Sequence, residues 1–122
     1  MPKKILLVDD SKSVRTIATI ALRDAGYEVM EAADGLQALG KLDGTQFNLI
    51  ISDVNMPVMD GITFLKELRR HAAGRFTPVI MLTTESGEDR KQEGRAAGAK
   101  AWIVKPFQPA TLVDAVSRLA LA

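Results

Sequence analysis

The sequence has no cysteine and only one histidine among its 122 residues. The absence of cysteine excludes disulfide bonds, thiolate metal sites and a cysteine nucleophile. Basic and acidic residues nearly cancel, at 16 and 15, so the chain has no excess of basic charge for binding nucleic acid. No apolar run approaches the roughly 18 residues of a membrane span, and the apolar residues 5–8 are too few for a signal peptide. We therefore expect a cytoplasmic protein that binds neither nucleic acid nor membranes.

What the sequence does contain is an ordinary globular composition in a short chain. Hydrophobic residues make up 47% and charged residues 25%, as in typical globular domains. A chain of this length supports one hydrophobic core, whereas two domains would each be too small. We expect a single monomeric domain over residues 1–122, without a separate effector domain.

Short apolar runs alternate with segments of helical periodicity. Residues 5–8, 49–51, 79–82 and 102–104 predict strands that are buried on both faces of a parallel sheet, and the alternating residues 27–31 predict an edge strand. Apolar residues at helical spacing predict helices within the ranges 14–25, 36–42, 62–68 and 112–120, and a weaker, polar helix within 86–97. Five β-α units predict an α/β fold with a doubly wound, flavodoxin-like parallel sheet.

Polar residues follow the ends of four of these strands. Asp9 and Asp10 follow the first, Asp53 the third, Thr83 the fourth and Lys105 the fifth. In a parallel sheet these ends lie along one edge, where α/β proteins bind ligands. Placing the edge strand beside the first gives the strand order 2-1-3-4-5. The three aspartates then meet where the strand order reverses.

The residue types at this edge indicate phosphoryl chemistry. Three neighbouring carboxylates repel each other unless a cation binds, and oxygen ligands without histidine or cysteine favour Mg²⁺ over Zn²⁺. Lys105 and Thr83 would bind phosphoryl oxygens, and one carboxylate would serve as the nucleophile.

Four short motifs lie at the ends of the predicted strands: residues 7–10 (LVDD), 53–61 (DVNMPVMDG), 83–85 (TTE) and 105–107 (KPF). In this order they resemble the motifs of a response-regulator receiver domain, and the resemblance covers the whole chain. Among receivers the chain most resembles the stand-alone, CheY-like regulators of chemotaxis, and CheY is itself an example of the 2-1-3-4-5 order.

The resemblance implies a role for each matching residue. Asp53 would be the phosphoacceptor, with Thr83 and Lys105 contacting its phosphoryl group. The expected Mg²⁺ ligands are Asp9, Asp10, Asp53 and the backbone carbonyl of Asn55. In addition, Asn55 and Glu85 would tune the lifetime of the phosphoryl group, Pro57 and Gly61 would shape the loop after Asp53, and Pro106 would follow a cis peptide bond.

The function implied is a phosphorylation-activated switch of a two-component system rather than a metabolic enzyme. A CheA-like histidine kinase would donate the phosphoryl group, and the receiver would promote only its own phosphorylation and dephosphorylation. The activated face, built from the fourth helix, fifth strand and fifth helix, would bind an output protein such as a flagellar-motor switch protein; a phosphatase is a further partner. Trp102 stands where receivers usually carry Tyr or Phe, and it either rotates on activation or belongs to the partner surface. The basic residues of this face are Arg90, Lys91, Arg95 and Lys100, which form either a partner surface or a solvated helix face.

Several other interpretations stay open from the sequence alone. Within the receiver class, the alternative is a phosphorelay intermediate or a phosphate sink. A flavodoxin-type electron carrier shares the topology, but Asp9 and Asp10 would repel the FMN phosphate. A Mg²⁺-dependent aspartyl-phosphate phosphatase would need a second aspartate at position 11, which is serine. Outside the site, we expect Asp60 to cap a helix, His71 to end one, and Met56 and Met59 to pack.

Overall fold

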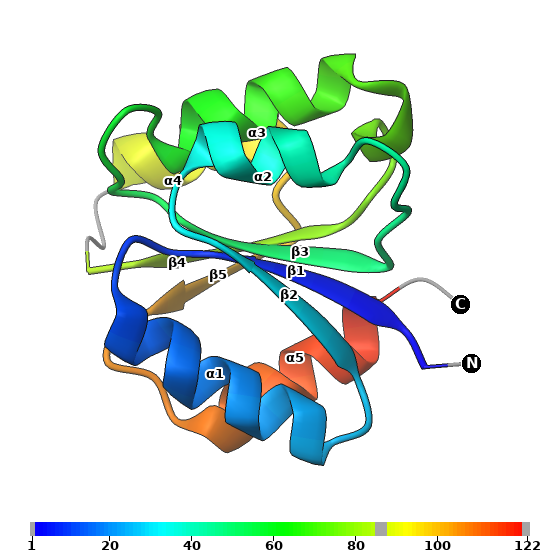
Figure 1. Cartoon of the computed structure of the whole chain (residues 1–122). Helices are drawn as coiled ribbons and strands as arrows, with labels where there is room; N and C mark the ends of the chain where they lie inside the picture. The colour runs from blue at the N-terminus through cyan, green and yellow to red at the C-terminus, as the bar shows by residue number, and fades with distance from the viewer. Residues whose placement is uncertain (1, 85–87, 121–122) are drawn as a thin grey trace.

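The computed structural model of the chain describes residues 2–84 and 88–120. Within these ranges, five strands alternate with five α-helices and one short 3-10 helix, η1 (Ala72–Gly74) (Figure 1). The strands are β1 (Lys4–Val8), β2 (Glu28–Ala32), β3 (Leu49–Asp53), β4 (Val79–Thr83) and β5 (Ala101–Val104). The helices are α1 (Lys12–Asp24), α2 (Gly35–Lys41), α3 (Gly61–Arg70), α4 (Glu88–Ala96) and α5 (Pro109–Leu119).

The strands form one parallel sheet in the order β2-β1-β3-β4-β5, which confirms the predicted topology. Helices α1 and α5 cover one face, and α2, α3 and α4 cover the other (Figure 1). Two apolar cores therefore lie on either side of the sheet, with β1, β3 and β4 buried between them. None of the described helices is long and apolar enough to cross a membrane.

Two predictions about burial are wrong. The apolar run 102–104 predicts a strand buried on both faces, but β5 lies at the edge of the sheet, where Val104 is 43% exposed. The amphipathic pattern of α1 places Ile17 in the core, but its side chain is 52% exposed. An apolar residue type indicates a preference for burial, but the number of helices and strands that pack around the residue determines how far it is buried.

Polar side chains cap the starts of α1 and α3, of which the sequence predicted the cap at Asp60. Ser11 caps α1 by accepting a hydrogen bond from the backbone N–H of Val14 at 3.3 Å, and Asp60 caps α3 by accepting one from Thr63 at 2.9 Å. His71 ends α3, as predicted. The weak helix predicted within 86–97 is present as α4, although residues 86 and 87 lie outside the described part of the chain.

Arg69 joins three segments at the end of the sheet opposite the aspartates. Its guanidinium donates hydrogen bonds to the carbonyl oxygens of Gly74 at 2.9 Å, Thr77 at 2.6 Å and Gly98 at 3.0 Å. Burial lowers the pKa of this guanidinium from its ordinary value. Arg69 thereby fastens the C-terminal end of α4 to α3 and to the start of β4.

We expect Arg69→Met to lower the free energy of unfolding by about 3 kcal/mol, because it leaves several backbone carbonyls without their charged donor. The matched control is Arg70→Met, since the Arg70 side chain is 79% exposed and its loss should change stability by no more than about 0.5 kcal/mol. Urea unfolding followed by circular dichroism measures both. Equal effects of the two changes would contradict the role of Arg69.

Candidate functional site

The carboxyl ends of β1, β3 and β5 bring two aspartates and a lysine into contact. Asp9 directly follows β1 and is fully buried, while Asp53 is the last residue of β3 and is 4% exposed. The Lys105 ammonium lies 2.7 Å from Oδ2 of Asp9 and 3.3 Å from Oδ1 of Asp53. One cation is therefore shared between two buried carboxylates.

Asp10 completes an acidic cluster at this edge. One carboxylate oxygen from each of Asp9, Asp10 and Asp53 lies within 4.8 Å of the others. Lys105 offsets one of the three negative charges, so the cluster retains two, the charge that a divalent cation neutralises. Oδ2 of Asp9 is buried, and its ion pair with the Lys105 ammonium offsets the loss of hydration. This set of oxygen donors fits a hard cation such as Mg²⁺.

The surroundings of Asp53 alter its acidity. Its pKa is raised from an ordinary value of 3.8 to about 6, chiefly by burial and then by the negative charge of Asp9. The charge of Lys105 and hydrogen bonds from Lys105 and the Asn55 backbone oppose this shift. At neutral pH the Asp53 carboxylate is ionised, but its burial beside Asp9 makes this ionised form unfavourable, as expected of a reactive group.

The loop between β3 and α3 wraps closely around Asp53. The backbone N–H of Asn55 donates to Oδ1 of Asp53 at 3.4 Å. Gly61 begins α3 against the same residue, and a Cβ at this position would overlap the carbonyl oxygen of Asp53. Pro57 and Val58 are exposed at the tip of the loop, where Val58 has a φ of 70°, a strained conformation for a β-branched residue.

Thr83 and the segment after β5 form the remaining side of the site. Thr83 is fully buried at the end of β4, and its carbonyl accepts a hydrogen bond from the Lys105 backbone at 2.7 Å. The Lys105–Pro106 peptide bond is cis, as the resemblance predicted. Glu85, the second predicted tuning residue, lies outside the described residues.

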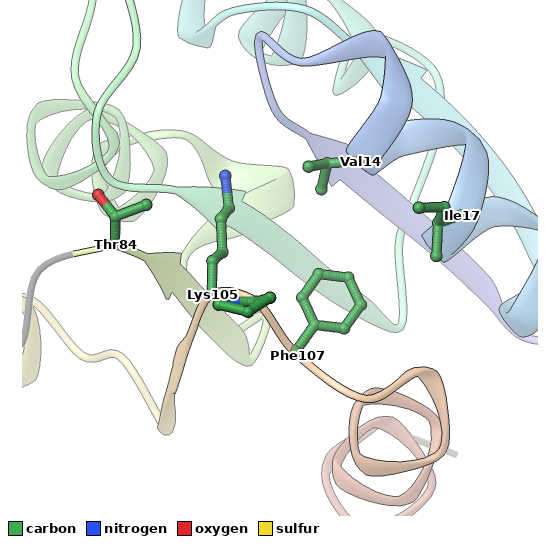
Figure 2. Close-up of a pocket in the computed structure, with 6 residues that line it drawn as sticks. Val14, Ile17, Thr84, Lys105 and Phe107 are labelled. Atoms are coloured by element: carbon green, nitrogen blue, oxygen red, sulfur yellow. The ribbon is translucent and has the colours of Figure 1, made fainter.

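An apolar pocket that the sequence did not indicate adjoins the acidic cluster. It has a volume of about 360 Å³ and lies between α1 and the loop after β5. Figure 2 shows Val14 and Ile17 of α1 facing Phe107, with Lys105 and Thr84 on the side toward the cluster. The exposed position of Ile17 is thus explained, because its side chain forms part of this wall.

Trp102 packs against α4 at a position that only glycine can occupy. A Cβ at Gly94 would lie 2.6 Å from Cζ3 of the Trp102 ring. The Trp102 indole nitrogen is buried and has no hydrogen-bond partner among the described residues. The glycine within a predicted helix was the only sequence signal of this contact, because a helix-interior glycine is unfavourable without a packing reason.

The other predicted residues do not belong to the group of carboxylates at the sheet edge. Met56 and Met59 pack against the core on the α2–α4 side, as expected. Arg90 falls within α4, and the remaining basic residues of this face are the half-buried Lys91 and the exposed Arg95 and Lys100.

Comparison with known proteins shows the family of this chain. A sequence model described as the response regulator receiver domain matches residues 5–117. The chain belongs to this family. The receiver is 40% identical over 117 residues to the chemotaxis protein CheY-3 of Vibrio cholerae, covering 95% of this chain and 90% of CheY-3. Its sequence therefore resembles that of a chemotaxis receiver.

Solved structures of other receivers match the fold. The chemotaxis protein CheY4 of Vibrio cholerae superposes with a TM-score of 0.93 at 51% identity, covering 98% of this chain and 99% of CheY4. The receiver domain of the sensor histidine kinase PA1611 from Pseudomonas aeruginosa has a TM-score of 0.88 at 32% identity, covers 98% of each chain, and holds a magnesium ion in its active-site cleft.

Family membership favours a receiver over a flavodoxin-type carrier or a phosphatase. Receiver domains are signalling modules of two-component systems, act with a histidine kinase and an output target, and bind Mg²⁺ at an acidic pocket. This chain has such an acidic cluster in Asp9, Asp10 and Asp53.

The raised pKa of Asp53 makes a prediction about stability. The folded protein holds this proton more tightly than the unfolded chain does, so the contribution of Asp53 to the free energy of unfolding should fall as the pH rises from 3.8 to about 6. In metal-free buffer, Asp53→Asn should therefore be more stable than the wild type by about 3 kcal/mol at pH 7.5. Near pH 4 the difference should be small.

Urea unfolding at a series of pH values measures this difference. A stability difference that stays constant from pH 4 to pH 8 would contradict the desolvation of the Asp53 carboxylate.

Proposed function

We propose that this receiver is a phosphorylation-activated signalling switch in which Asp53 accepts a phosphoryl group from a histidine kinase. The observation that carries the proposal is the convergence of Asp9, Asp10 and Asp53 with Lys105 at one edge of the sheet. This site provides a nucleophile, ligands for a divalent cation and a cation for phosphoryl oxygens.

The transfer begins with the ionised carboxylate of Asp53, whose pKa of about 6 leaves it deprotonated at neutral pH. A carboxylate oxygen forms a bond to the phosphorus of a phosphohistidine. The P–N bond breaks, and the departing imidazole nitrogen retains the electron pair. Hydrolysis later breaks the bond between phosphorus and the carboxylate oxygen, releases inorganic phosphate and restores Asp53.

The residues around Asp53 have distinct roles in this proposal. Asp9, Asp10, Asp53 and the Asn55 carbonyl would hold Mg²⁺, which would supply neutralisation of the charge on the phosphoryl group. Lys105 would pair with phosphoryl oxygens, and the Thr83 hydroxyl would donate a hydrogen bond to one of them. Asn55 and Glu85 tune the rate of hydrolysis.

The apolar pocket beside the cluster supports docking of the phosphoryl donor. Val14, Ile17 and Phe107 offer a wall where apolar side chains of a kinase can bind while its phosphohistidine approaches Asp53. Burial of apolar surface would hold the two proteins together although the net charge of this receiver is only +1.

The phosphorylated receiver would bind its output protein through the face formed by α4, β5 and α5. Phosphorylation adds charge and acceptor oxygens at Asp53, Thr83 moves to meet them, and the packing of Trp102 on α4 changes. The basic residues Lys91, Arg95 and Lys100 would contribute to the altered surface, together with Arg90. By similarity to CheY-3 and CheY4, we propose a chemotaxis-type kinase as donor and a flagellar-motor switch protein as partner, in the cytoplasm.

The first test is phosphorylation by a small phosphodonor such as acetyl phosphate. The wild type should incorporate one phosphoryl group only when Mg²⁺ is present, and Asp53→Asn should incorporate none, because its amide is not a nucleophile. Intact-protein mass spectrometry measures the incorporation. The matched control is Asp60→Asn, since Asp60 caps α3 and the variant should be labelled like the wild type.

Stoichiometric labelling of Asp53→Asn would contradict the assignment of the phosphoacceptor. A phosphorylated receiver that transfers its phosphoryl group onward but binds no output protein would instead indicate a phosphorelay intermediate.

A further inference from the structure

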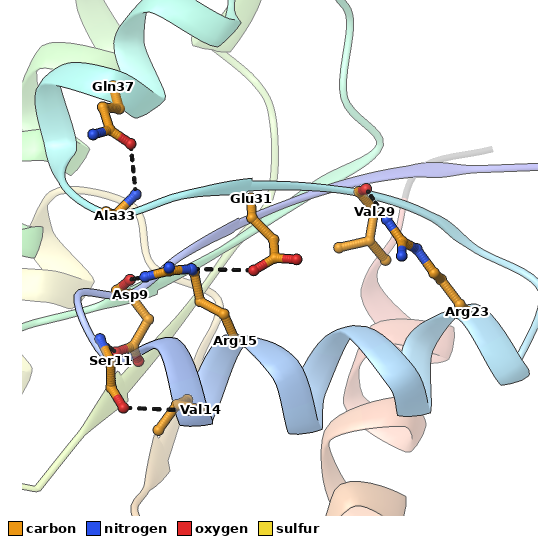
Figure 3. Close-up of polar contacts among 9 residues, drawn as sticks. All are labelled: Asp9, Ser11, Val14, Arg15, Arg23, Val29, Glu31, Ala33 and Gln37. Atoms are coloured by element: carbon orange, nitrogen blue, oxygen red, sulfur yellow. Dashed lines mark hydrogen bonds and ion pairs between the residues drawn. The ribbon is translucent and has the colours of Figure 1, made fainter.

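Arg15, near the start of α1, connects the acidic cluster to the edge strand β2 (Figure 3). Its Nη1 donates a hydrogen bond to the backbone carbonyl of Asp9 at 2.7 Å, and its Nε donates to Oε1 of Glu31 at 3.1 Å. The Arg15 side chain is only 17% exposed. A cation near the N-terminus of a helix opposes the helix dipole, so a compensating contact is expected.

The contact with Arg15 is one of four that hold Asp9. The Asp9 backbone N–H donates to the carbonyl of Ala32 at 3.1 Å. Oδ1 of Asp9 accepts a hydrogen bond from the Ser11 backbone at 2.9 Å, and Oδ2 pairs with Lys105 at 2.7 Å. Among the residues that the structure describes, only Arg15 donates a hydrogen bond to the carbonyl of Asp9.

The position of the Asp9 carbonyl oxygen also fixes the orientation of the peptide group that leads to Asp10. The carbonyl of Asp9 and the Cα of Asp10 lie in one rigid peptide plane. A hold on the oxygen therefore also sets the direction in which the chain leaves Asp9. The Asp10 side chain is exposed, and its carboxylate reaches the cluster from this backbone. Arg15 is thus placed to orient both acidic residues after β1.

The charge of Arg15 is already balanced. Its ion pair with Glu31 is neutral as a whole, so it does not replace the cation that the three carboxylates require. Its effect on the cluster is then one of geometry rather than of charge neutralisation.

We propose that Arg15 is a positioning residue for the Mg²⁺ site, which holds the Asp9–Asp10 peptide so that both carboxylates face Asp53. The inference rests on the proposed function, because it assumes that the cluster binds Mg²⁺. It adds to that function a residue that contacts neither metal nor phosphoryl group.

The test is isothermal titration of the metal-free protein with Mg²⁺. The wild type should bind one ion. Arg15→Met should bind it about tenfold more weakly, as for other residues that orient metal ligands, and Arg15→Lys should lie between the two because it can still donate one hydrogen bond. The matched control is Arg23→Met. Arg23 lies on the same helix and donates to the Val29 carbonyl of the same strand at 3.2 Å, away from the cluster (Figure 3).

The direction in which the Mg²⁺ dissociation constant changes when Arg15 is replaced distinguishes the possible roles of this residue. If the residue acted only as a nearby positive charge, its removal would tighten Mg²⁺ binding. If it were only a structural link, Arg15→Met and Arg23→Met would lower the melting temperature and leave the Mg²⁺ dissociation constant unchanged. Either result would overturn the inference.

Two further arms keep the test decisive. If Arg15→Met does not fold, Arg15→Lys, which keeps the positive charge, takes its place, and weakened Mg²⁺ binding supports the positioning role, whereas unchanged binding overturns it. Failure of the wild type to bind Mg²⁺ would instead overturn the proposed function itself.

Discussion

The structure depends on one constraint, the confinement of three carboxylates beside a single lysine. Backbone pairing fixes the ends of β1 and β3, so Asp9 and Asp53 cannot move apart to relieve their repulsion. Lys105 offsets only part of the charge. Burial and then the negative charge of Asp9 raise the pKa of Asp53. A divalent cation or a change of charge at Asp53 therefore has a large effect on the site.

The rest of the fold holds this unfavourable arrangement in place. Gly61 lets α3 begin directly against the backbone of Asp53, and Arg15 restrains the chain at Asp9. At the other end of the sheet, Arg69 fastens the C-terminal end of α4. Trp102 packs against Gly94 close to this fixed end of α4.

The sequence predicted what depends on local pattern. Buried strands such as β1 and β3 have continuous apolar runs, and Asp9, Asp53 and Lys105 follow their strands directly, so the topology and the cluster could be inferred together. It did not predict what depends on distant neighbours. The 52% exposure of Ile17 follows from the pocket beside Phe107, and long side chains such as Arg15 bind backbone carbonyls, which have no sequence signature. Residue types therefore indicated the chemistry, whereas the supporting contacts required the structure.

The most direct test of the account is whether a phosphoryl mimic at Asp53 changes the surroundings of Trp102. Trp102 is the only tryptophan in the chain, so its fluorescence can be recorded while beryllofluoride is titrated in the presence of Mg²⁺. We expect a saturable change in Trp102 fluorescence that requires Mg²⁺ and is absent in Asp53→Asn. Unchanged emission at concentrations where fluorine NMR detects bound beryllofluoride would contradict it.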